Sequence, residues 1–285
     1  MYSQESAKPH QIEALNRIYN RGRVALKFID THCHIIPEVD DGPPDTATSV
    51  EMARIAVADG ISTIFVTPHI IEGYYDGSDL GQRLQALTAV LAENDISLNL
   101  ISGAEVPMSA CNEGNRDVLS GLTLGKGSFL LIETADTTID QIASAAYQVR
   151  LCGLYPVLAH PERSAFVRNN LGRLEEILGN KDVFCQITAA SIEGLFGSDV
   201  QRTCYSMLAA GMVHLVATDA HSTGRRKPVL SESYRLLKKT AGIEVADKVM
   251  YENPKRVLDG DILLQPSVMS GRVSNKNFLA RLFRK

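Results

Sequence analysis

Two short motifs bring together side chains that bind metal ions. His32 and His34 are separated by one residue, and so are Asp219 and His221. Residues two apart on a β-strand lie on the same side of it, so both members of each pair can reach one ion. Imidazole and carboxylate ligands without a thiolate suit manganese, iron, zinc or cobalt. Cys33, between the two histidines, would point the other way and pack in the core.

Similar residues follow other apolar runs that have the length of β-strands. Four such runs end at or just before His69, Glu105, Glu133 and His160. A single histidine at a strand end is more often structural than a ligand, but six strand ends with such residues are not expected by chance. Five of the 7 histidines lie in this set. We interpret the other two, His10 and His214, as structural or surface residues.

One ion does not need so many ligands, so we expect the site to hold two or three ions. Carboxylates such as Glu105 and Asp219 can bridge neighbouring ions. Ions about 3.5–4 Å apart hold a hydroxide at neutral pH and clamp both oxygens of an in-line displacement. The residues therefore predict a multinuclear metal site that hydrolyses a phosphate ester.

Strands that alternate with helices would position these residues. Apolar runs predict seven strands, at Phe28–His32, Ser62–Thr67, Ser97–Gly103, Phe129–Glu133, Pro156–His160, Val183–Thr188 and Val213–Thr218. Helical spacing of apolar residues occurs near 50–57, 84–91, 174–178 and 229–237. This alternation indicates an α/β fold with a mostly parallel sheet. We favour a closed or nearly closed barrel, because its strand ends converge on one face, whereas an open sheet spreads them along a line.

Composition and charge exclude several classes of protein. With 45% hydrophobic and 22% charged residues in 285, the chain has an ordinary globular balance. A net charge of -4 gives no electrostatic case for binding nucleic acid. No apolar run reaches the roughly 18 residues of a spanning helix, and the N-terminus lacks the apolar region of a secretory signal. Five cysteines without CxxC spacing suggest no disulfide framework, so we expect a cytoplasmic protein.

The two ends of the chain differ from its body. We expect an amphipathic helical extension at 1–27, the metal-binding barrel at 28–264 and a basic tail at 265–285. The tail has no acidic residue and carries Arg272, Lys276, Arg281, Arg284 and Lys285. A solvated tail is the more common explanation, and peripheral contact with a membrane surface or a partner is the alternative.

The motifs resemble those of a known superfamily. Asp30-Thr-His-Cys-His34, Thr67-Pro-His69, His160 and Asp219-Ala-His221 look like the polymerase and histidinol phosphatase (PHP) superfamily. The chain resembles more closely the bacterial manganese-dependent protein-tyrosine phosphatases of capsule and exopolysaccharide operons. The matching segments run in order from about residue 28 to 260: FIDTHCHIIPEVDDGP, EMARIAVADGISTIFVTPH, SGAEV, VLAHPER, QITAASIEGLFG, ATDAHS and ENPKRVL.

The resemblance implies a distorted, TIM-like (β/α)7 barrel with three ions, expected to be Mn²⁺. One ion would be held by His32, His34, Glu105 and Asp219. A second would be held by Glu105, Glu133 and His160. A third would be held by Asp41, His69 and His221. Asp40, which precedes the matching aspartate, would face away or cap the turn before Gly42.

The resemblance also implies two phosphate-binding arginines. Arg163 in the segment HPER matches one of them. The other follows the Asp-x-His motif and usually precedes a proline. Arg226 has this spacing, although the inserted Lys227 leaves Arg225 as an alternative. The expected reaction is in-line attack of a metal-bridged hydroxide on phosphotyrosine, with the arginines stabilising the charge on phosphorus.

The implied function is a protein-tyrosine phosphatase that regulates capsular or exopolysaccharide synthesis. Its partner would be a tyrosine-phosphorylated protein, expected to be an autophosphorylating tyrosine kinase. None of the five cysteines has an arginine six residues later, as a cysteine-dependent tyrosine phosphatase requires.

Three alternatives remain open. The first is a PHP-type phosphatase of a small phosphomonoester such as histidinol phosphate. The second is an amidohydrolase-like enzyme acting on C–N bonds, although the six strand ends carry no bridging lysine. The third is a metal-stabilised regulatory domain with a decayed site, against which the full ligand set argues.

Overall fold

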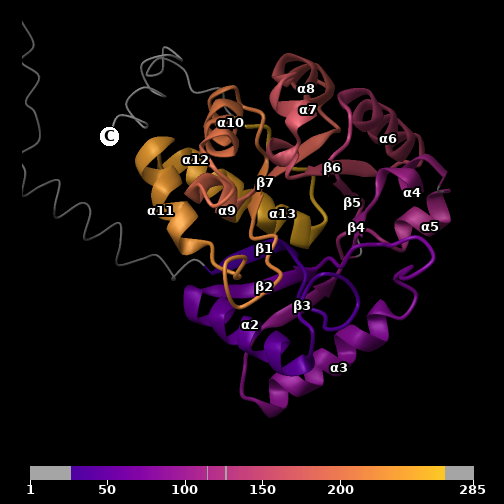
Figure 1. Ribbon diagram of the computed structural model, residues 1–285, viewed down its shortest axis with the longest axis vertical. Coiled ribbons are helices and arrows are strands. Elements are labelled where there is room, and N and C mark those ends of the chain that lie inside the picture. The colour runs from indigo at the N-terminus through magenta and orange to yellow at the C-terminus, as the bar shows by residue number, and fades with distance from the viewer. Residues whose placement is uncertain (1–26, 114, 126, 267–285) are drawn as a thin grey trace, which may run out of the picture.

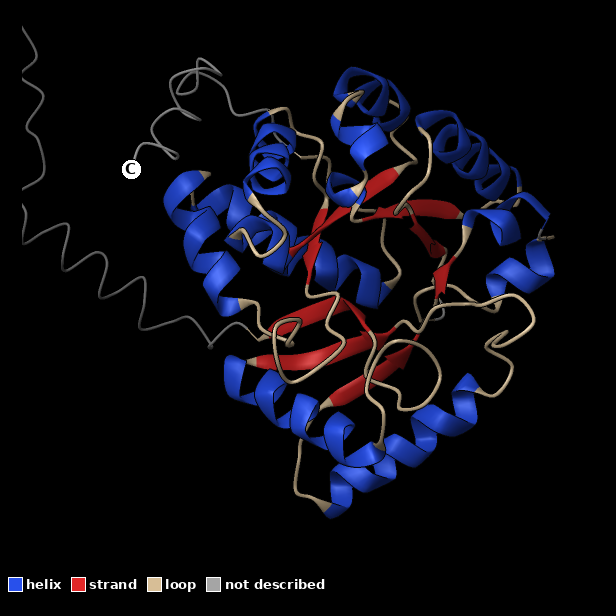
Figure 2. Ribbon diagram, viewed as in Figure 1, coloured by secondary structure: helices blue, strands red, loops and turns tan. Residues whose placement is uncertain are grey.

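Parallel strands form the centre of the structure, and helices surround them (Figures 1 and 2). The computed structural model describes residues 27–266 except residues 114 and 126. The predicted N-terminal helix and basic tail lie outside the described residues, apart from residues 27, 265 and 266. The division into extension, barrel and tail therefore stays a prediction.

The strands form two sheets in which every neighbouring pair is parallel. The three-stranded sheet has the order β1 (Phe28–Cys33), β2 (Ile61–Val66) and β3 (Asn99–Ser102). The five-stranded sheet has the order β4 (Glu105–Val106), β5 (Phe129–Glu133), β6 (Tyr155–Ala159), β7 (Phe184–Thr188) and β8 (Leu215–Ala217).

The two sheets join at both edges, and this closes a distorted barrel. At one edge only residues 103–104 separate β3 from β4, so the chain passes directly from one sheet into the other. At the other edge, the His34 N–H donates to the Ala220 carbonyl at 2.9 Å, and the Asp219 N–H donates to the His32 carbonyl at 2.8 Å. The predicted TIM-like barrel is confirmed.

One strand differs from the prediction. The run expected as Ser97–Gly103 forms only β3, and the two-residue β4 follows as a separate strand. The seven expected strands are therefore eight, unless β3 and β4 are counted as one broken strand. A Cβ atom added to Gly103 would lie 2.9 Å from a side-chain carbon of Leu124, closer than carbon atoms approach in proteins. The break thus lies where Leu124 packs directly on the backbone.

Helices cover the outside of both sheets (Figure 1). The three-stranded sheet is covered by α2 (Thr46–Asp59) and α3 (Leu80–Glu93). The other α-helices are α4 (Met108–Glu113), α5 (Arg116–Ser120), α6 (Ile139–Leu151), α7 (Ala165–Arg168), α8 (Leu171–Leu178), α9 (Ala189–Glu193), α10 (Ser198–Ala209), α11 (Ser231–Thr240), α12 (Ile243–Asp247) and α13 (Asn253–Asp259). A 3₁₀ turn, η1 (Pro161–Arg163), and a π-helical turn, η2 (Lys248–Glu252), complete the set. None of the helices within the described ranges is both long and apolar enough to cross a membrane.

The four predicted helices are confirmed as α2, α3, α8 and α11. Helix α2 shows how local sequence sets its ends. The Asp45 side chain accepts a hydrogen bond from the Thr48 N–H at 2.7 Å, which satisfies one free donor of the first turn. Gly60 ends the helix with a φ of 93°, a conformation that glycine adopts without steric cost. The left-handed conformation of Gly60 turns the chain, and β2 begins at the next residue, Ile61.

The barrel interior is apolar where the strands begin and polar where they end. Phe129 and Phe184, the first residues of β5 and β7, pack there with Phe65. Val257 of α13 and Leu263 belong to the same cluster, so α13 packs against the end of the barrel where the strands begin. Apolar side chains thus fill the start of the barrel, and the polar residues gather at its carboxyl end.

His214 is a buried structural histidine, as the sequence suggests. Its Nδ1 accepts a hydrogen bond from the Cys185 N–H at 3.2 Å, and its ring meets Phe184 edge-on at 5.1 Å between centroids. Burial lowers the pKa of His214 to about 4. The ring is therefore neutral at pH 7, which agrees with Nδ1 acting as an acceptor. His10 lies outside the described residues.

The free energy of unfolding should depend on pH through His214. The unfolded chain binds this proton near pH 6.5 and the folded chain only near pH 4. The contribution of the neutral ring is therefore complete above pH 6.5 and is lost as the pH falls toward 4, by at most about 3 kcal/mol. Urea unfolding measures the free energy of unfolding at pH 7 and at pH 4. Between these two values wild type should lose up to about 3 kcal/mol more than His214→Gln does. An equal loss in both proteins would contradict the prediction.

Candidate metal centre

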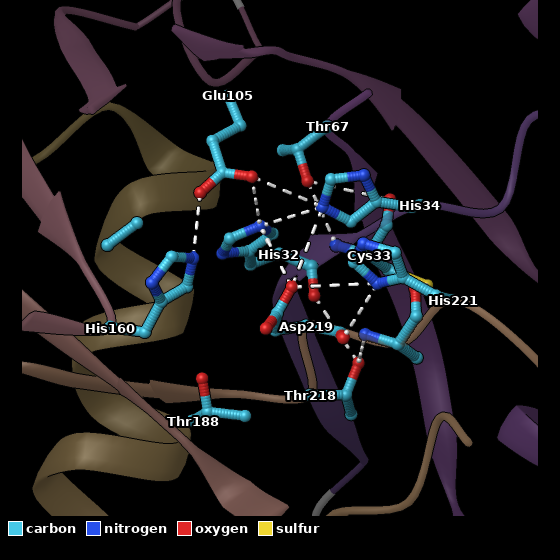
Figure 3. A network of polar contacts seen from close by, with 12 residues as sticks. His32, Cys33, His34, Thr67, Glu105, His160, Thr188, Thr218, Asp219 and His221 are labelled. Atoms are coloured by element: carbon cyan, nitrogen blue, oxygen red, sulfur yellow. Dashed lines mark hydrogen bonds and ion pairs between the residues drawn. The ribbon is translucent and has the colours of Figure 1, made fainter. Parts of the chain in front are cut away.

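Imidazoles and carboxylates gather where the strands end (Figure 3). Six of them are at most 5% exposed: His32, His34, Glu105, His160, Asp219 and His221. His69 and Glu133 have side chains that are 26% and 24% exposed, and the Asp41 side chain is 62% exposed. The structure thus brings together all nine residues that were expected as ligands. Groups of this kind are rarely buried without partners or ions.

The first expected group surrounds the end of β1. The Nε2 atoms of His32 and His34 lie 3.0 Å apart, and they lie 3.2 and 3.3 Å from Glu105 Oε2. Asp219 Oδ1 lies 3.5 Å from His32 Nε2 and 3.6 Å from His34 Nε2. Cys33 points into the outer core, as expected from the strand period. Four ligand atoms therefore face one point.

The second expected group contains Glu105, Glu133 and His160. Glu105 Oε1 lies 2.9 Å from His160 Nε2, and Glu133 Oε1 lies 3.6 Å from His160 Nδ1. His69 also belongs here, because its Nδ1 lies 3.0 Å from Glu105 Oε2 and 4.0 Å from Glu133 Oε2. His69 was expected only in the third group.

The third expected group lies at the rim of the centre. Asp41 Oδ1 lies 3.0 Å from His221 Nε2 and 3.6 Å from His69 Nε2. His34 offers a ligand atom within 4.8 Å of these three residues as well. His69 and His34 therefore lie between groups, and the three sets expected from sequence overlap more than predicted.

The spacing of these atoms fits divalent cations. Atoms bound about 2.1 Å from one ion stand about 3.0–3.4 Å from each other, which matches the separations around Glu105. Three buried atoms of the candidate ligands, His160 Nδ1, Asp219 Oδ1 and His221 Nε2, have no hydrogen-bond partner. Buried polar atoms are nearly always satisfied, so an ion would supply what these three lack. The donor set of imidazole and carboxylate suits manganese, iron, zinc or cobalt.

The electrostatics of the cluster favour positive charge. Burial by itself lowers the pKa of His34, but hydrogen bonds to Asp40 and Glu105 raise it to about 10. Burial likewise opposes the charged form of Glu105, yet His32 and His160 hold its pKa well below the usual value. The carboxylates thus attract a cation strongly, whether a proton or a metal ion.

Asp40 orients one imidazole of the centre. Its Oδ2 lies 2.7 Å from His34 Nδ1 and accepts a hydrogen bond from the His69 N–H at 3.0 Å. Its Oδ1 accepts from the Gly42 N–H at 2.9 Å. Of the two expected alternatives for Asp40, the turn cap is confirmed, and the side chain faces His34 rather than away from the centre. A carboxylate on the far nitrogen fixes the tautomer and direction of a metal-binding imidazole.

Two further polar residues support the centre, and neither was predicted. Gln186 Oε1 lies 3.1 Å from His32 Nδ1. Gln186 alternates with Phe184 and Thr188 on β7, and this period of two is the signal that could have placed it in the interior. Asp30 accepts a hydrogen bond from the Thr218 N–H at 2.9 Å, which ties β1 to the end of β8.

Two buried candidate ligands have unusual backbone conformations. His160 and Asp219 have φ values of 35° and 51°, in the left-handed region that side chains other than glycine rarely adopt. Each directly or closely follows its strand, and the turn directs the side chain into the centre. Strain of this kind persists where surrounding contacts over-determine it.

Two guanidiniums converge at the edge of the centre. Arg163 Nη1 donates to Asp219 Oδ2 at 2.7 Å, and Arg226 Nη2 donates to the same oxygen at 2.8 Å. Arg226 Nη1 also lies 3.7 Å from Asp41 Oδ2. Both side chains are about one quarter exposed, at 25% and 24%. Arg225 is exposed, so Arg226 is the arginine that lies at the centre.

Comparison with known proteins identifies the family. The family model for capsular polysaccharide synthesis proteins, CpsB/CapC, matches residues 28–259. The chain belongs to the CpsB/CapC family. Tyrosine-protein phosphatase YwqE of Bacillus subtilis is 36% identical over 221 residues, which cover 76% of this chain and 87% of YwqE.

Solved structures agree with this family and with the fold. A chain from the crystal structures of YwqE from Bacillus subtilis and CpsB from Streptococcus pneumoniae, described as metal-dependent tyrosine phosphatases, matches with a TM-score of 0.76 and 32% identity. The match covers 84% of this chain and 99% of the solved chain. The phosphotriesterase homology protein of Escherichia coli matches at a TM-score of 0.52 and 10% identity, over 82% and 99% of the two chains. The latter likeness shows a shared barrel fold alone.

Removing the carboxylate of Asp40 should weaken metal binding. Asp40→Asn keeps the size of the side chain but loses the charge that orients His34, so affinity for Mn²⁺ should fall by about 10- to 100-fold. Isothermal titration calorimetry measures this directly. Asp140→Asn is the matched control, because the Asp140 side chain is 85% exposed on α6. Equal Mn²⁺ affinity in wild type and Asp40→Asn would refute the orienting role.

Proposed function

We propose that this chain is a metal-dependent protein-tyrosine phosphatase. The convergence of Arg163 and Arg226 on one carboxylate oxygen, beside a cluster of metal-type ligands, carries the proposal. Guanidinium groups match phosphate oxygens in shape and charge, and the ligand cluster supplies the site for ions. The similarity to YwqE supports the choice of phosphotyrosine over histidinol phosphate.

Nine side chains would hold two or three ions, proposed to be Mn²⁺: His32, His34, Asp41, His69, Glu105, Glu133, His160, Asp219 and His221. Bound divalent ions supply Lewis acidity and a nucleophilic oxygen at neutral pH. Glu105 would serve more than one ion; its two oxygens face different imidazoles, which supports this role. Iron, zinc and cobalt share the same ligand preference.

The arginines would bind and orient the phosphoryl group. Each directs one Nη at Asp219 Oδ2, and both groups are open to solvent on one side. Fixed positive groups beside the phosphoryl oxygens stabilise the charge that develops in the transition state. A tyrosine leaves as a phenolate whose conjugate acid has a pKa of about 10, so little help from a general acid is needed.

The proposed substrate is a tyrosine-phosphorylated protein, in the first place an autophosphorylating tyrosine kinase of polysaccharide synthesis. The description of the matched family names capsular polysaccharide synthesis, which supports this partner. All five cysteines are free, which supports a reducing cytoplasm as the location. Contact of the basic tail with a membrane is a prediction about residues outside the described part of the chain.

Activity should require both metal and the centre. After treatment with a chelator, wild type should release no phosphate from a phosphotyrosyl peptide, and added Mn²⁺ should restore release. His34→Ala should stay inactive with Mn²⁺, because it removes a shared ligand. A phosphoseryl peptide and histidinol phosphate serve as competing substrates and should be turned over more slowly. No turnover with any divalent metal would sink the proposal.

Arg226 and Arg225 give a matched pair of variants. Arg226→Ala should lower kcat/KM for the phosphotyrosyl peptide by about 10²–10³, the usual loss for one group that stabilises transition-state charge. Arg225→Ala removes the same charge from an exposed neighbour and should change kcat/KM less than about twofold. A larger loss of kcat/KM in Arg225→Ala than in Arg226→Ala would contradict the prediction, because Arg225 would then be the arginine that binds phosphate.

A further inference from the structure

Phe196 lies against the guanidinium of Arg163. The central carbon of this guanidinium is 4.7 Å from the centroid of the Phe196 ring. Through Nη1 the same group donates to Asp219 Oδ2 at 2.7 Å. A cation over an aromatic face is attracted by the negative face of the ring, and arginine is the cation most often found there. Arg163 is thus held by a carboxylate at one nitrogen and by the face of an aromatic ring at its central carbon.

The turn that carries Phe196 is held by backbone hydrogen bonds. It follows α9, which begins directly after β7. Gly194 and Gly197 have φ values of 89° and 94°, which only glycine adopts easily. The Leu195 N–H donates to the Ala190 carbonyl at 2.9 Å, and the Gly197 N–H donates to the Gly194 carbonyl at 3.0 Å. The half-buried ring is therefore presented from a fixed backbone.

The backbone of Arg163 is held by other contacts. Arg168 Nη1 donates to the carbonyls of Arg163 and Glu162, at 2.5 and 3.2 Å. The buried Glu162 accepts a hydrogen bond from the Thr188 N–H at 3.0 Å. Main chain and side chain of Arg163 are thus fixed separately, and Phe196 acts on the side chain.

The two arginines differ in what they contact besides Asp219. Arg226 also faces Asp41, with 3.7 Å between Nη1 and Oδ2, so carboxylates lie near two of its nitrogens. Arg163 has the Phe196 ring instead. A phosphate that takes the place of Asp219 Oδ2 would release Arg163 from its carboxylate, and the ring would still hold the guanidinium in place.

We propose that Phe196 is a positioning residue that holds Arg163 in the orientation that binds phosphate. The inference rests on the proposed function, since it takes Arg163 as a phosphate-binding group. Phe196 acts through Arg163 rather than on the phosphoryl group. Removing the ring therefore weakens phosphate binding only while Arg163 is present.

The test measures binding of inorganic phosphate to the Mn²⁺-loaded chain by isothermal titration calorimetry. Phe196→Leu keeps an apolar side chain and removes the ring, and Phe196→Trp keeps an aromatic face. Phe166→Leu is the matched control, because Phe166 is a half-exposed phenylalanine of the nearby α7. Arg163→Ala and the double variant Arg163→Ala/Phe196→Leu complete a double-mutant cycle.

Phe196→Leu should weaken phosphate binding by about tenfold, while Phe196→Trp and Phe166→Leu stay within about twofold of wild type. Affinity for Mn²⁺ and the midpoint of thermal unfolding should be the same in all of them. In the Arg163→Ala background, Phe196→Leu should cause no further loss. If Phe196→Leu does not fold, as judged by circular dichroism, Phe196→Met takes its place.

Three results would overturn the inference. The first is wild-type phosphate affinity in Phe196→Leu. The second is the same loss in the Arg163→Ala background, which would mean that Phe196 acts independently of Arg163. The third is an equal loss in Phe196→Trp. The inference on Phe196 is tested by phosphate binding and not by turnover. A wild-type chain that binds phosphate but does not hydrolyse phosphotyrosine would therefore overturn the proposed function and leave the inference on Phe196 standing.

Discussion

A fully buried carboxylate, that of Glu105, organises both the fold and the centre. Its Oε2 lies within 3.3 Å of nitrogens of His32, His34 and His69, and its Oε1 lies 2.9 Å from His160. A buried charge costs several kcal/mol unless it is paired, so the imidazoles of three strand ends must reach one residue. Glu105 begins β4, where the chain passes from one sheet to the other, and the Glu105 backbone pairs with His69. An open sheet could not bring these strand ends together, and the closed barrel does.

Residue types and strand period were enough to predict the barrel and to assemble eight of the nine ligand candidates. This worked because parallel strands put their carboxyl ends on one face, so a ligand at the end of each strand needs no further information. The ninth, Asp41, lies in a loop and was expected only from the family resemblance. The contacts of each imidazole were less predictable. The contact of Gln186 with His32 depends on strand register, and the contact of Asp40 with His34 depends on the path of a loop. One sequence specifies neither. The break between β3 and β4 likewise depends on how Leu124 packs on Gly103.

The barrel alone says little about chemistry. A phosphotriesterase homology protein shares it at 10% identity, and a D-hydantoinase shares it at the same identity with a TM-score of 0.51. Function on such a scaffold is set by the loops after the strands. Here those loops add Arg163 from η1 and Arg226 from the turn after His221, and the turn after α9 adds Phe196. The ligand cluster sits on the strand ends, while the groups suited to phosphate come from the loops.

The net charge of the centre explains why an anionic substrate would need both the arginines and the metal ions. Asp40, Asp41, Glu105, Glu133 and Asp219 contribute five negative charges, and Arg163 and Arg226 contribute two positive ones. With the neutral imidazoles that metal binding requires, these groups have a formal charge of -3, which disfavours a phosphate dianion. Two divalent ions would bring the formal charge to about +1 and three to about +3. Metal binding would therefore reverse the sign of the centre, and an anionic substrate would then be attracted by the ions as well as by the two arginines.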